Sequence, residues 1–167
     1  MTLETPPSGY LEGDEHVLPI RVYYEDTDAA GIVYYANYLK FAERGRTELL
    51  RLIGVDQTAL RRDHGFAFAV RDCAADYRQP ARLDDALQVR SRLAELRGAS
   101  VRLDQRVVRA RGVADEATEQ TLVQIGVRVV CLRLADGRAV RLPREQHDIF
   151  QAFGDAGLSQ LKNATGS

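Results

Sequence analysis

A change of hydrophobic period at Gly31 is the feature that most constrains how this chain can fold. Before it, residues 20–24 alternate between the two sides of the chain, as a strand does. After it, apolar residues recur every three or four positions, and charged residues fill most of the gaps. The recurring set is Tyr35, Tyr38, Leu39, Ala42, Gly45, Leu49, Leu52 and Ile53. At 3.6 residues per turn, this predicts an amphipathic helix of about five turns directly after the strand.

An acidic segment lies between these two elements. Residues 25–28 hold three carboxylates, Glu25, Asp26 and Asp28, which cannot all be buried and ionised, so some face water or one occupies a special site. The helix start that follows offers free backbone N–H groups and the positive end of the helix dipole. Acyl transfer needs such donors beside a base or a nucleophile. From the residues alone, however, Asp28 is better explained as an ordinary turn-forming acid. Glu25 and Asp26 are expected to be structural or solvated, with Asp26 bracing the loop.

The rest of the chain predicts short helices and several strands. Gly54 suits the C-terminal cap of the long helix, and Asp56 suits the N-cap of a short helix to about residue 63. Apolar residues then alternate in four segments, which begin near Phe66, Leu87, Val101 and Val123. Short links between consecutive strands indicate an antiparallel sheet. Asp136-Gly137 is typical of a hairpin turn, and Pro143 of the first residue of a last short helix through Phe150.

These elements predict an α+β fold in which a curved antiparallel sheet of about five strands wraps a long central helix. Gly45 and Ala42 on the apolar face of the helix allow a close approach to the sheet. Glu43 and Arg46 lie three residues apart on the helix and are expected to form an ion pair. We expect one domain over residues 18–152, a disordered N-terminal tail over 1–17 and a flexible C-terminal tail over 153–167. A polar loop holding Asp115, Glu116 and Thr118 separates the last two strands.

Composition narrows the function classes. With a net charge of −1, the protein as a whole has no positive electrostatic field that would attract nucleic acid. The start of the chain does not resemble a signal peptide, and no apolar run approaches the ~18 residues that a membrane span needs, so we expect a cytoplasmic protein with Cys73 and Cys131 reduced. The three histidines, His16, His64 and His147, share no metal motif. Serine-hydrolase and phosphate-loop patterns are missing from the sequence.

Two stretches carry a resemblance to a known family. Residues 23–38 read Tyr-Tyr-Glu-Asp-Thr-Asp-Ala-Ala-Gly-Ile-Val-Tyr-Tyr-Ala-Asn-Tyr, and residues 41–48 read Phe-Ala-Glu-Arg-Gly-Arg-Thr-Glu. They resemble the hotdog-fold acyl-CoA thioesterases of the 4-hydroxybenzoyl-CoA thioesterase-like superfamily, most of all its Tol–Pal-associated YbgC-type branch. Residues 77–85 and 96–100 also match, so the resemblance covers roughly residues 18–152.

The resemblance implies a set of site residues. Asp28 falls on the family's catalytic acid, and Tyr35 stands at the helix start, where its backbone N–H is the expected oxyanion donor. Many YbgC-type members carry histidine at this position, so the Tyr35 side chain is a departure. The substrate-binding residues implied for the loop and for the coenzyme A phosphates are Gly31, Ile32, Val33, Tyr34, Arg97, Gly98 and Ser100, with Arg92 and Arg102 as weaker candidates.

The resemblance further implies hydrolysis of an acyl-CoA to a free carboxylic acid and coenzyme A, without a metal or redox cofactor. Asp28 acts either as general base or as nucleophile, and both remain open. Hotdog proteins pair edge strands, so a homodimer or homotetramer is implied, and a link to the Tol–Pal envelope system rests on the resemblance alone. Two alternatives stay open: a non-catalytic acyl-CoA-binding hotdog module, and a hotdog dehydratase or hydratase. The sequence does not fix the acyl chain.

Overall fold

The computed structural model describes residues 7–110 and 119–164, with side chains described as far as residue 156. Within these residues the chain forms six strands, three α-helices and one 3-10 helix. In chain order they are β1 (Tyr10–Glu12), β2 (Glu15–Arg21), η1 (Tyr24–Asp26), α1 (Asn37–Ile53), α2 (Gln57–His64), β3 (Phe66–Tyr77), β4 (Ala86–Leu96), β5 (Ser100–Arg109), β6 (Gln120–Arg133) and α3 (Arg144–Ala164).

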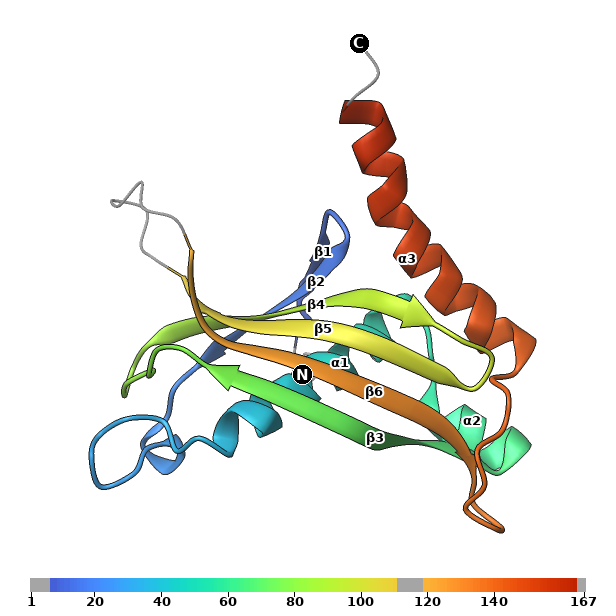
Figure 1. The fold of residues 1–167 in the computed structure, drawn as a ribbon, viewed down its shortest axis with the longest axis horizontal. Helices are drawn as coiled ribbons and strands as arrows, with labels where there is room; N and C mark the ends of the chain where they lie inside the picture. Colours follow the sequence, from blue (N-terminus) through green and yellow to red (C-terminus); the bar gives the residue numbers. More distant parts are fainter. Residues whose placement is uncertain (1–6, 111–118, 165–167) are drawn as a thin grey trace, which may run out of the picture.

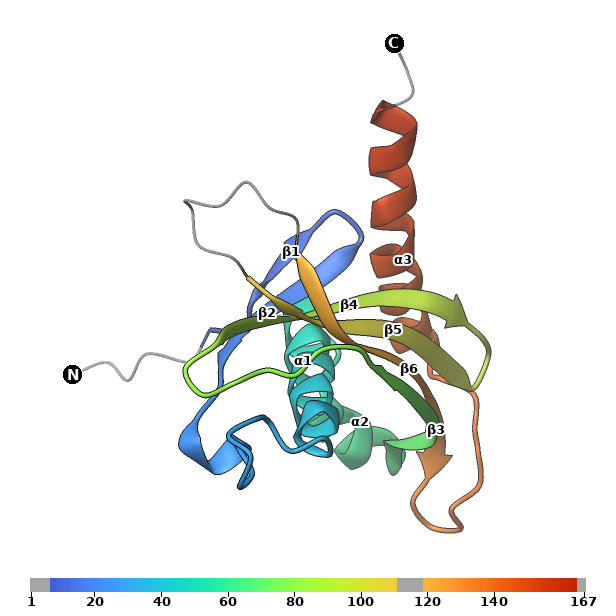
Figure 2. The same cartoon turned by 60° about the vertical axis from the view of Figure 1, so that its left-hand side comes forward.

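The strands form one antiparallel sheet in the order β1-β2-β4-β5-β6-β3. The sheet curves over α1, which runs along its concave side (Figure 1, Figure 2). The predicted α+β class and the helix wrapped by a curved sheet are therefore confirmed, with six strands in the sheet rather than about five. Among the described strands, β3 lies at one edge and has β6 as its single neighbour.

The amphipathic pattern places the apolar face of α1 against the sheet. Tyr38, Phe41 and Leu49 are buried, as the 3.6-residue period requires. Gly45 lies so close to β4 that a Cβ there would come within 2.6 Å of Val89 Cγ1. The close approach expected at Gly45 is confirmed, and it sets how deeply the helix sits in the sheet.

Local capping signals also correspond to the structure. Gly54 ends α1 with a φ of 91°, and its N–H donates to the carbonyl groups of Leu50 and Arg51. Asp56 caps α2 by accepting the N–H groups of Thr58 and Ala59 at 2.9 and 3.0 Å. The predicted turn at Asp136-Gly137 is present, because Arg133 N–H donates to the Arg138 carbonyl at 2.8 Å.

The N-terminal prediction was wrong in two respects. The strand expected over residues 20–24 ends at Arg21, because Tyr24–Asp26 fold into η1. Residues 10–12 and 15–21 are strands rather than a tail, with His16 and Val17 fully buried. Pairing of β2 with β4, together with ion pairs from Glu15 to Arg90 and Arg106, orders this segment. Residues 1–6 lie outside the described part.

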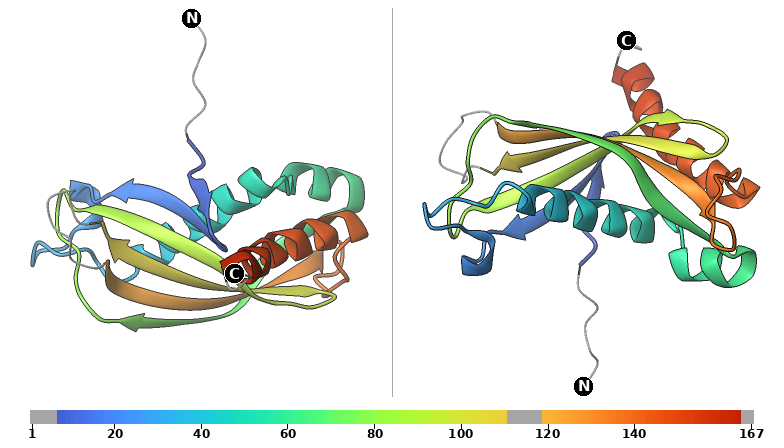
Figure 3. Two further views of the ribbon diagram at one scale, coloured as in Figure 1. Left: turned by 90° about the horizontal axis from the view of Figure 1, so that it is seen from above. Right: turned by 60° about the horizontal axis from the view of Figure 1, so that its bottom comes forward.

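The C-terminal prediction was also wrong in part. The last helix begins at Arg144, one residue after the predicted start at Pro143, and it runs on to Ala164, so residues 153–164 are helical rather than a flexible tail. Phe150 and Phe153 are buried in the core, and a Cβ at Gly154 would lie 2.6 Å from Leu93 Cδ2. Beyond this contact α3 extends away from the sheet (Figure 1, Figure 3). The expected polar loop of Asp115, Glu116 and Thr118 lies outside the described residues.

None of the helices in the described chain is both long and apolar enough to cross a membrane.

Candidate active site

The acidic loop between β2 and α1 folds back on itself around Gly31. Thr27 and Val33 form an isolated antiparallel bridge, and Asp28 N–H donates to the Ile32 carbonyl at 2.9 Å. Gly31 N–H returns a bond to the Asp28 carbonyl at 3.0 Å. Gly31 has a φ of 75°, a left-handed conformation that a side chain resists, which explains why glycine occupies this corner. The loop therefore holds Asp28 at the start of a tight turn.

Asp28 presents its carboxylate to solvent within this turn. Its Oδ1 accepts the N–H of Ala30 at 2.8 Å, a bond that orients the side chain. No basic side chain in the described residues forms an ion pair with Asp28, and the residue is exposed. The second carboxylate oxygen, Oδ2, has no hydrogen-bond partner in the described residues and is therefore available to a reacting group.

Asp26 has a different role. It is 7% exposed, and its Oδ2 accepts the N–H of Tyr23 at 2.8 Å. Its backbone carbonyl accepts two further donors, the Tyr34 N–H at 2.9 Å and the Asn37 Nδ2 at 2.8 Å. These bonds confirm the expectation that Asp26 braces the loop. They also tie the loop to the first residue of α1.

The start of α1 has free backbone donors. Ala36 occupies the N-cap without a side-chain cap, and the first turn contains no acidic residue. Asn37 N–H donates to the Tyr34 carbonyl at 2.8 Å, whereas the N–H groups of Tyr35 and Ala36 have no acceptor in the described residues. Free N–H groups at a helix start, reinforced by the helix dipole, stabilise negative charge.

Aromatic side chains surround this helix start. The Tyr35 ring lies 4.8 Å from the Tyr34 ring and 6.0 Å from the Tyr77 ring, centroid to centroid. A side-chain hydrogen bond with Tyr35 raises the pKa of Tyr34, with smaller contributions from the charge of Tyr35 and from burial. Tyr38 is buried beneath them, and its hydroxyl accepts the N–H of Ala81 at 2.8 Å. Burial raises the pKa of Tyr38.

Tyr77 and Ala81 had no role assigned from the sequence. Ala81 also accepts the Val33 N–H at 2.9 Å, so the segment between β3 and β4 fixes the far side of the acidic loop. These two residues lie inside the stretch 77–85 that carries the family resemblance, and this was the only signal for them in the sequence.

The predicted phosphate-contacting residues lie elsewhere. Arg97, Gly98 and Ser100 form the turn between β4 and β5, where Arg97 N–H donates to the Ser100 carbonyl at 2.8 Å. This turn and the acidic loop lie at opposite ends of the sheet (Figure 1). The two surface hollows lined by Arg97 contain neither Asp28 nor Tyr35. One chain therefore does not bring the two halves of the predicted site together.

Arg97 is not free at this turn. Its side chain is 64% exposed and forms an ion pair with Glu95 at 2.8 Å. Glu95 is also held by Arg128 at 3.0 Å, and Arg128 Nη1 donates to Ser100 Oγ at 3.4 Å. Gly98 packs beneath Arg141, whose Nε lies 3.1 Å from the position of a Cβ on Gly98.

Sequence reasoning missed two arginines in this region. Arg128 lines both hollows that contain Arg97, and Arg71 lines one of them. Arg128 lies directly opposite Arg102 in the pairing of β5 with β6. Only that register places Arg128 beside the β4–β5 turn, and the spacing of residues along the chain does not predict this proximity.

The remaining candidates do not form a metal centre. No group of three or more His, Cys, Asp or Glu side chains in the described residues is arranged to hold a metal ion. His16 is buried with its Nε2 2.6 Å from the Ser8 carbonyl, and His64 stacks on Phe66. Cys131 is buried and Cys73 is exposed, and neither forms a disulfide in the described chain.

Comparisons with known proteins agree with this architecture. The family model described as Thioesterase-like superfamily matches residues 22–152. The chain is similar to an acyl-CoA thioesterase, YbgC, of Haemophilus influenzae, with 42% identity over 132 residues, 79% of this chain and 91% of the relative. It is also similar to an acyl-CoA thioester hydrolase, YbgC, of Escherichia coli, with 45% identity over 115 residues, 68% of this chain and 79% of the relative.

Among solved structures, a probable thioesterase from Bartonella henselae superposes with a TM-score of 0.67 at 33% identity, covering 77% of this chain and 99% of that one. The fold around the acidic loop is therefore shared with proteins of the same family. Because the family model spans most of the chain and the relatives exceed 40% identity over most of their own length, the chain belongs to the thioesterase-like superfamily.

Proposed function

We propose that this protein is an acyl-CoA thioesterase, which hydrolyses an acyl-CoA to a free carboxylic acid and coenzyme A. One observation carries the chemistry: a solvent-facing Asp28 carboxylate without an ion-pair partner in the described residues, set in the loop that leads to the free N–H groups of Tyr35 and Ala36. A base or nucleophile and a pair of oxyanion donors are what thioester cleavage requires. The relatives that carry the YbgC name support the choice of substrate class.

In this mechanism the thioester carbonyl oxygen accepts the N–H of Tyr35, with Ala36 as a second donor. Asp28 then acts in one of two ways. As a general base it takes a proton from water, whose oxygen attacks the carbonyl carbon, and the proton passes to the departing sulfur of coenzyme A. As a nucleophile it attacks the carbonyl carbon itself, expels the thiolate, and leaves an anhydride that water hydrolyses. Both routes use the Tyr35 backbone and leave its hydroxyl without a required step.

We include in the proposal a homo-oligomer, a dimer or a tetramer. The edge strand β3 supports it, since residues 70–74 are exposed in succession on a strand of 12 residues that, within the described part of the chain, pairs only with β6. A long unpaired edge of this kind favours pairing with another chain. The site then combines Asp28 of one subunit with Arg97 and Arg128 of another, which accounts for their separation within one chain. A single monomeric species in light scattering at micromolar concentration contradicts this part.

From the YbgC-type resemblance we also propose a cytoplasmic enzyme that works with the Tol–Pal envelope system. Cell fractionation, and co-purification with the Tol–Pal proteins from the native host, test these two statements separately. Recovery of the protein in the membrane fraction contradicts the cytoplasmic location. Absence of the Tol–Pal proteins from the purified sample contradicts the link to that system.

The activity itself is tested by thiol release from a panel of acyl-CoAs. Wild-type protein is expected to release coenzyme A from at least one member of the panel, and Asp28→Asn is the matched control. Tight binding of an acyl-CoA without any release of thiol supports instead the non-catalytic binding module. Addition of water to an enoyl-CoA without release of thiol supports the hydratase alternative.

A further inference from the structure

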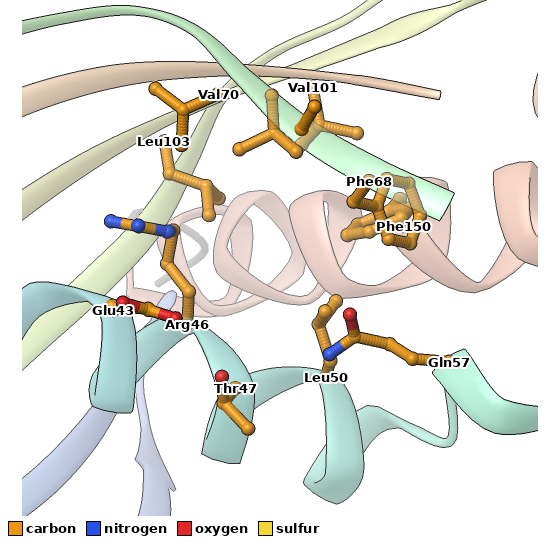
Figure 4. A pocket seen from close by; sticks show the side chains of 12 residues that line it. Glu43, Arg46, Thr47, Leu50, Gln57, Phe68, Val70, Val101, Leu103 and Phe150 are labelled. Atoms are coloured by element: carbon orange, nitrogen blue, oxygen red, sulfur yellow. The ribbon is translucent and has the colours of Figure 1, made fainter. Parts of the chain in front are cut away.

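A cavity separate from the acidic loop opens between the middle of α1, the start of β3 and the start of α3. Its volume is about 280 Å³, and Arg46, Thr47 and Leu50 of α1 form one wall (Figure 4). Asp28 and Tyr35 are not part of its lining. Ligand sites are typically concave and apolar with a few polar groups placed to orient the ligand, and this lining has that composition.

One end of the cavity carries the cationic side chain of Arg46 next to the carboxylate of Glu43. Arg46 is half-buried and extends along the cavity toward Leu103 and Val70 (Figure 4). Its Nη1 donates to Gln105 Oε1 at 2.9 Å, and it forms no ion pair among the described side chains. The ion pair expected between Glu43 and Arg46 is therefore not formed at contact distance, although the charge of Glu43 acts on Arg46. Burial lowers the pKa of Arg46, with opposing effects from Glu43 and Cys73.

Gln105 fixes the position of the Arg46 guanidinium. The amide nitrogen of Gln105 donates both to the Ala42 carbonyl at 2.9 Å and to Ser91 Oγ at 2.8 Å. These two bonds leave the amide oxygen of Gln105 directed at Arg46. An arginine has five N–H donors. When one of them bonds to Gln105, others remain that can bind an anion through two parallel hydrogen bonds.

The other end of the cavity is aromatic. Phe68 of β3 and Phe150 of α3 meet edge to face there, with ring centroids 6.2 Å apart. Val101 and Leu103 close the side toward the sheet (Figure 4), and Val129 is also part of the lining. A ligand that bridges the two ends has an anionic head and an apolar tail.

We propose that this cavity binds a free aliphatic carboxylate, with its carboxylate on the Arg46 guanidinium and its tail between Phe68 and Phe150. This goes beyond the proposed function, because binding here needs neither Asp28 nor turnover. A forked guanidinium matches a carboxylate through two parallel hydrogen bonds, and a partly desolvated site strengthens them. Contact of the tail with the two rings removes apolar surface from water. A carboxylic acid released by thioester cleavage belongs to the same chemical class.

The first test uses wild-type protein and three ligands of equal chain length: octanoate, octanol and octylamine. Titration calorimetry at neutral pH is expected to rank them in that order, with octanoate at least about tenfold tighter than octanol, since a charge-assisted hydrogen bond is worth that factor or more. Octanol bound as tightly as octanoate overturns the proposal, because the guanidinium then contributes nothing.

The second test assigns the site. Arg46→Gln keeps a hydrogen-bond donor for Gln105. It is expected to lower the affinity for octanoate about tenfold or more and to leave the affinity for octanol unchanged. Arg44→Gln, on the exposed side of the same helix, is the matched control and should bind octanoate as the wild type does. Asp28→Asn should also retain octanoate binding, which separates this cavity from the proposed reaction site.

If Arg46→Gln does not fold, photocrosslinking of wild-type protein with a diazirine-bearing octanoate decides the question. Labelling at Phe68, Val70 or Phe150 supports the proposal. Labelling confined to the acidic loop, or loss of octanoate binding in Asp28→Asn, overturns it, since the carboxylate then occupies the reaction site. Octanoate binding with no thiol release from any acyl-CoA supports the cavity and contradicts only the proposed function.

Discussion

Asn37, the first residue of α1, donates its side-chain amide to the backbone carbonyl of Asp26 over 2.8 Å, and both residues are buried. The same carbonyl accepts the Tyr34 N–H at 2.9 Å. The helix start and the acidic loop are thus joined at a single oxygen atom. The position of Asp28 relative to the free N–H groups of Tyr35 and Ala36 depends on this junction.

Asn37→Ala removes the side-chain bond and leaves the Tyr34 bond in place. The free energy of unfolding should fall by about 1–2 kcal/mol, the usual cost of losing a buried hydrogen bond. The larger effect should be on kcat for acyl-CoA hydrolysis, because the loop can then move relative to the oxyanion donors. Chemical denaturation and steady-state kinetics measure the two effects separately. A variant with unchanged kcat shows that the junction does not position the reacting groups.

Gly45→Ala tests how closely α1 approaches the sheet. A Cβ at this position meets Val89 Cγ1 at 2.6 Å, and overpacking of this kind costs about 1–3 kcal/mol. The gain in helix propensity, about 1 kcal/mol, opposes it, so we expect a net loss of stability in urea unfolding. Val89→Ala in the same chain should restore part of the loss.

The matched control for Gly45→Ala is Gly126→Ala, where the nearest heavy atom to an added Cβ is Arg102 Nη2 at 3.8 Å. It should change the stability much less, since no backbone or core side chain is displaced. Equal losses in the two variants contradict the close contact at Val89.

His16 gives the stability a pH dependence. Burial lowers its pKa, against the opposing effects of its bond to Ser8 and of the charge of Glu48, so the folded protein holds the ring neutral at a pH where the unfolded chain is protonated. The unfolded state therefore binds more protons below about pH 6.5, the ordinary histidine value. Stability should fall as the pH drops from about 6.5 toward the lower folded pKa.

The measurement is the urea midpoint of wild type and His16→Gln at pH values above and below 6.5. The glutamine amide can keep a donor near the Ser8 carbonyl but does not titrate. The difference between the two proteins should therefore shrink or change sign as the pH falls. Parallel pH profiles for the two proteins contradict a role for His16.

Arg97→Ala and Arg128→Ala test the proposed phosphate contacts. Each substitution should raise KM for an acyl-CoA. The rise in KM should be much smaller for a pantetheine thioester, because that substrate lacks the nucleotide phosphates. Arg138→Ala, at the exposed turn that follows β6, is the control and should leave both values unchanged. Equal loss on both substrates means that the arginines act through the fold, by way of the ion pairs that each makes with Glu95.

The elements that the sequence predicted well are those whose signals are local. The period of α1, the left-handed glycine at Gly54 and the side-chain cap of Asp56 each lie within a few residues of what they determine. Residues 15–19 of β2 lie outside the strand predicted over residues 20–24, because their order comes from pairing with β4. Glu15 pairs with Arg90 at 2.7 Å across 75 positions of sequence, and no local pattern carries that contact.

The same distinction applies to the site. The motif around Asp28 is contiguous, so the family resemblance located the acidic loop and the helix start together. Arg128, by contrast, reaches the β4–β5 turn only through the register of β5 with β6. The spacing of Glu43 and Arg46 predicts a helical ion pair, whereas only the fold places Gln105 next to Arg46.

The central claim is that Asp28 performs the chemistry and that the backbone at Tyr35, not its phenol, holds the oxyanion. The decisive measurement is kcat for the best acyl-CoA substrate in Asp28→Asn and Tyr35→Phe. Both variants should remain folded, because Asp28 and Tyr35 are exposed and neither change opens a cavity. We expect Asp28→Asn to lose on the order of 10² or more in kcat and Tyr35→Phe to retain most of it. An inactive Tyr35→Phe beside an active Asp28→Asn contradicts the account, since it moves the chemistry to the phenol and leaves the acidic loop as a structural turn.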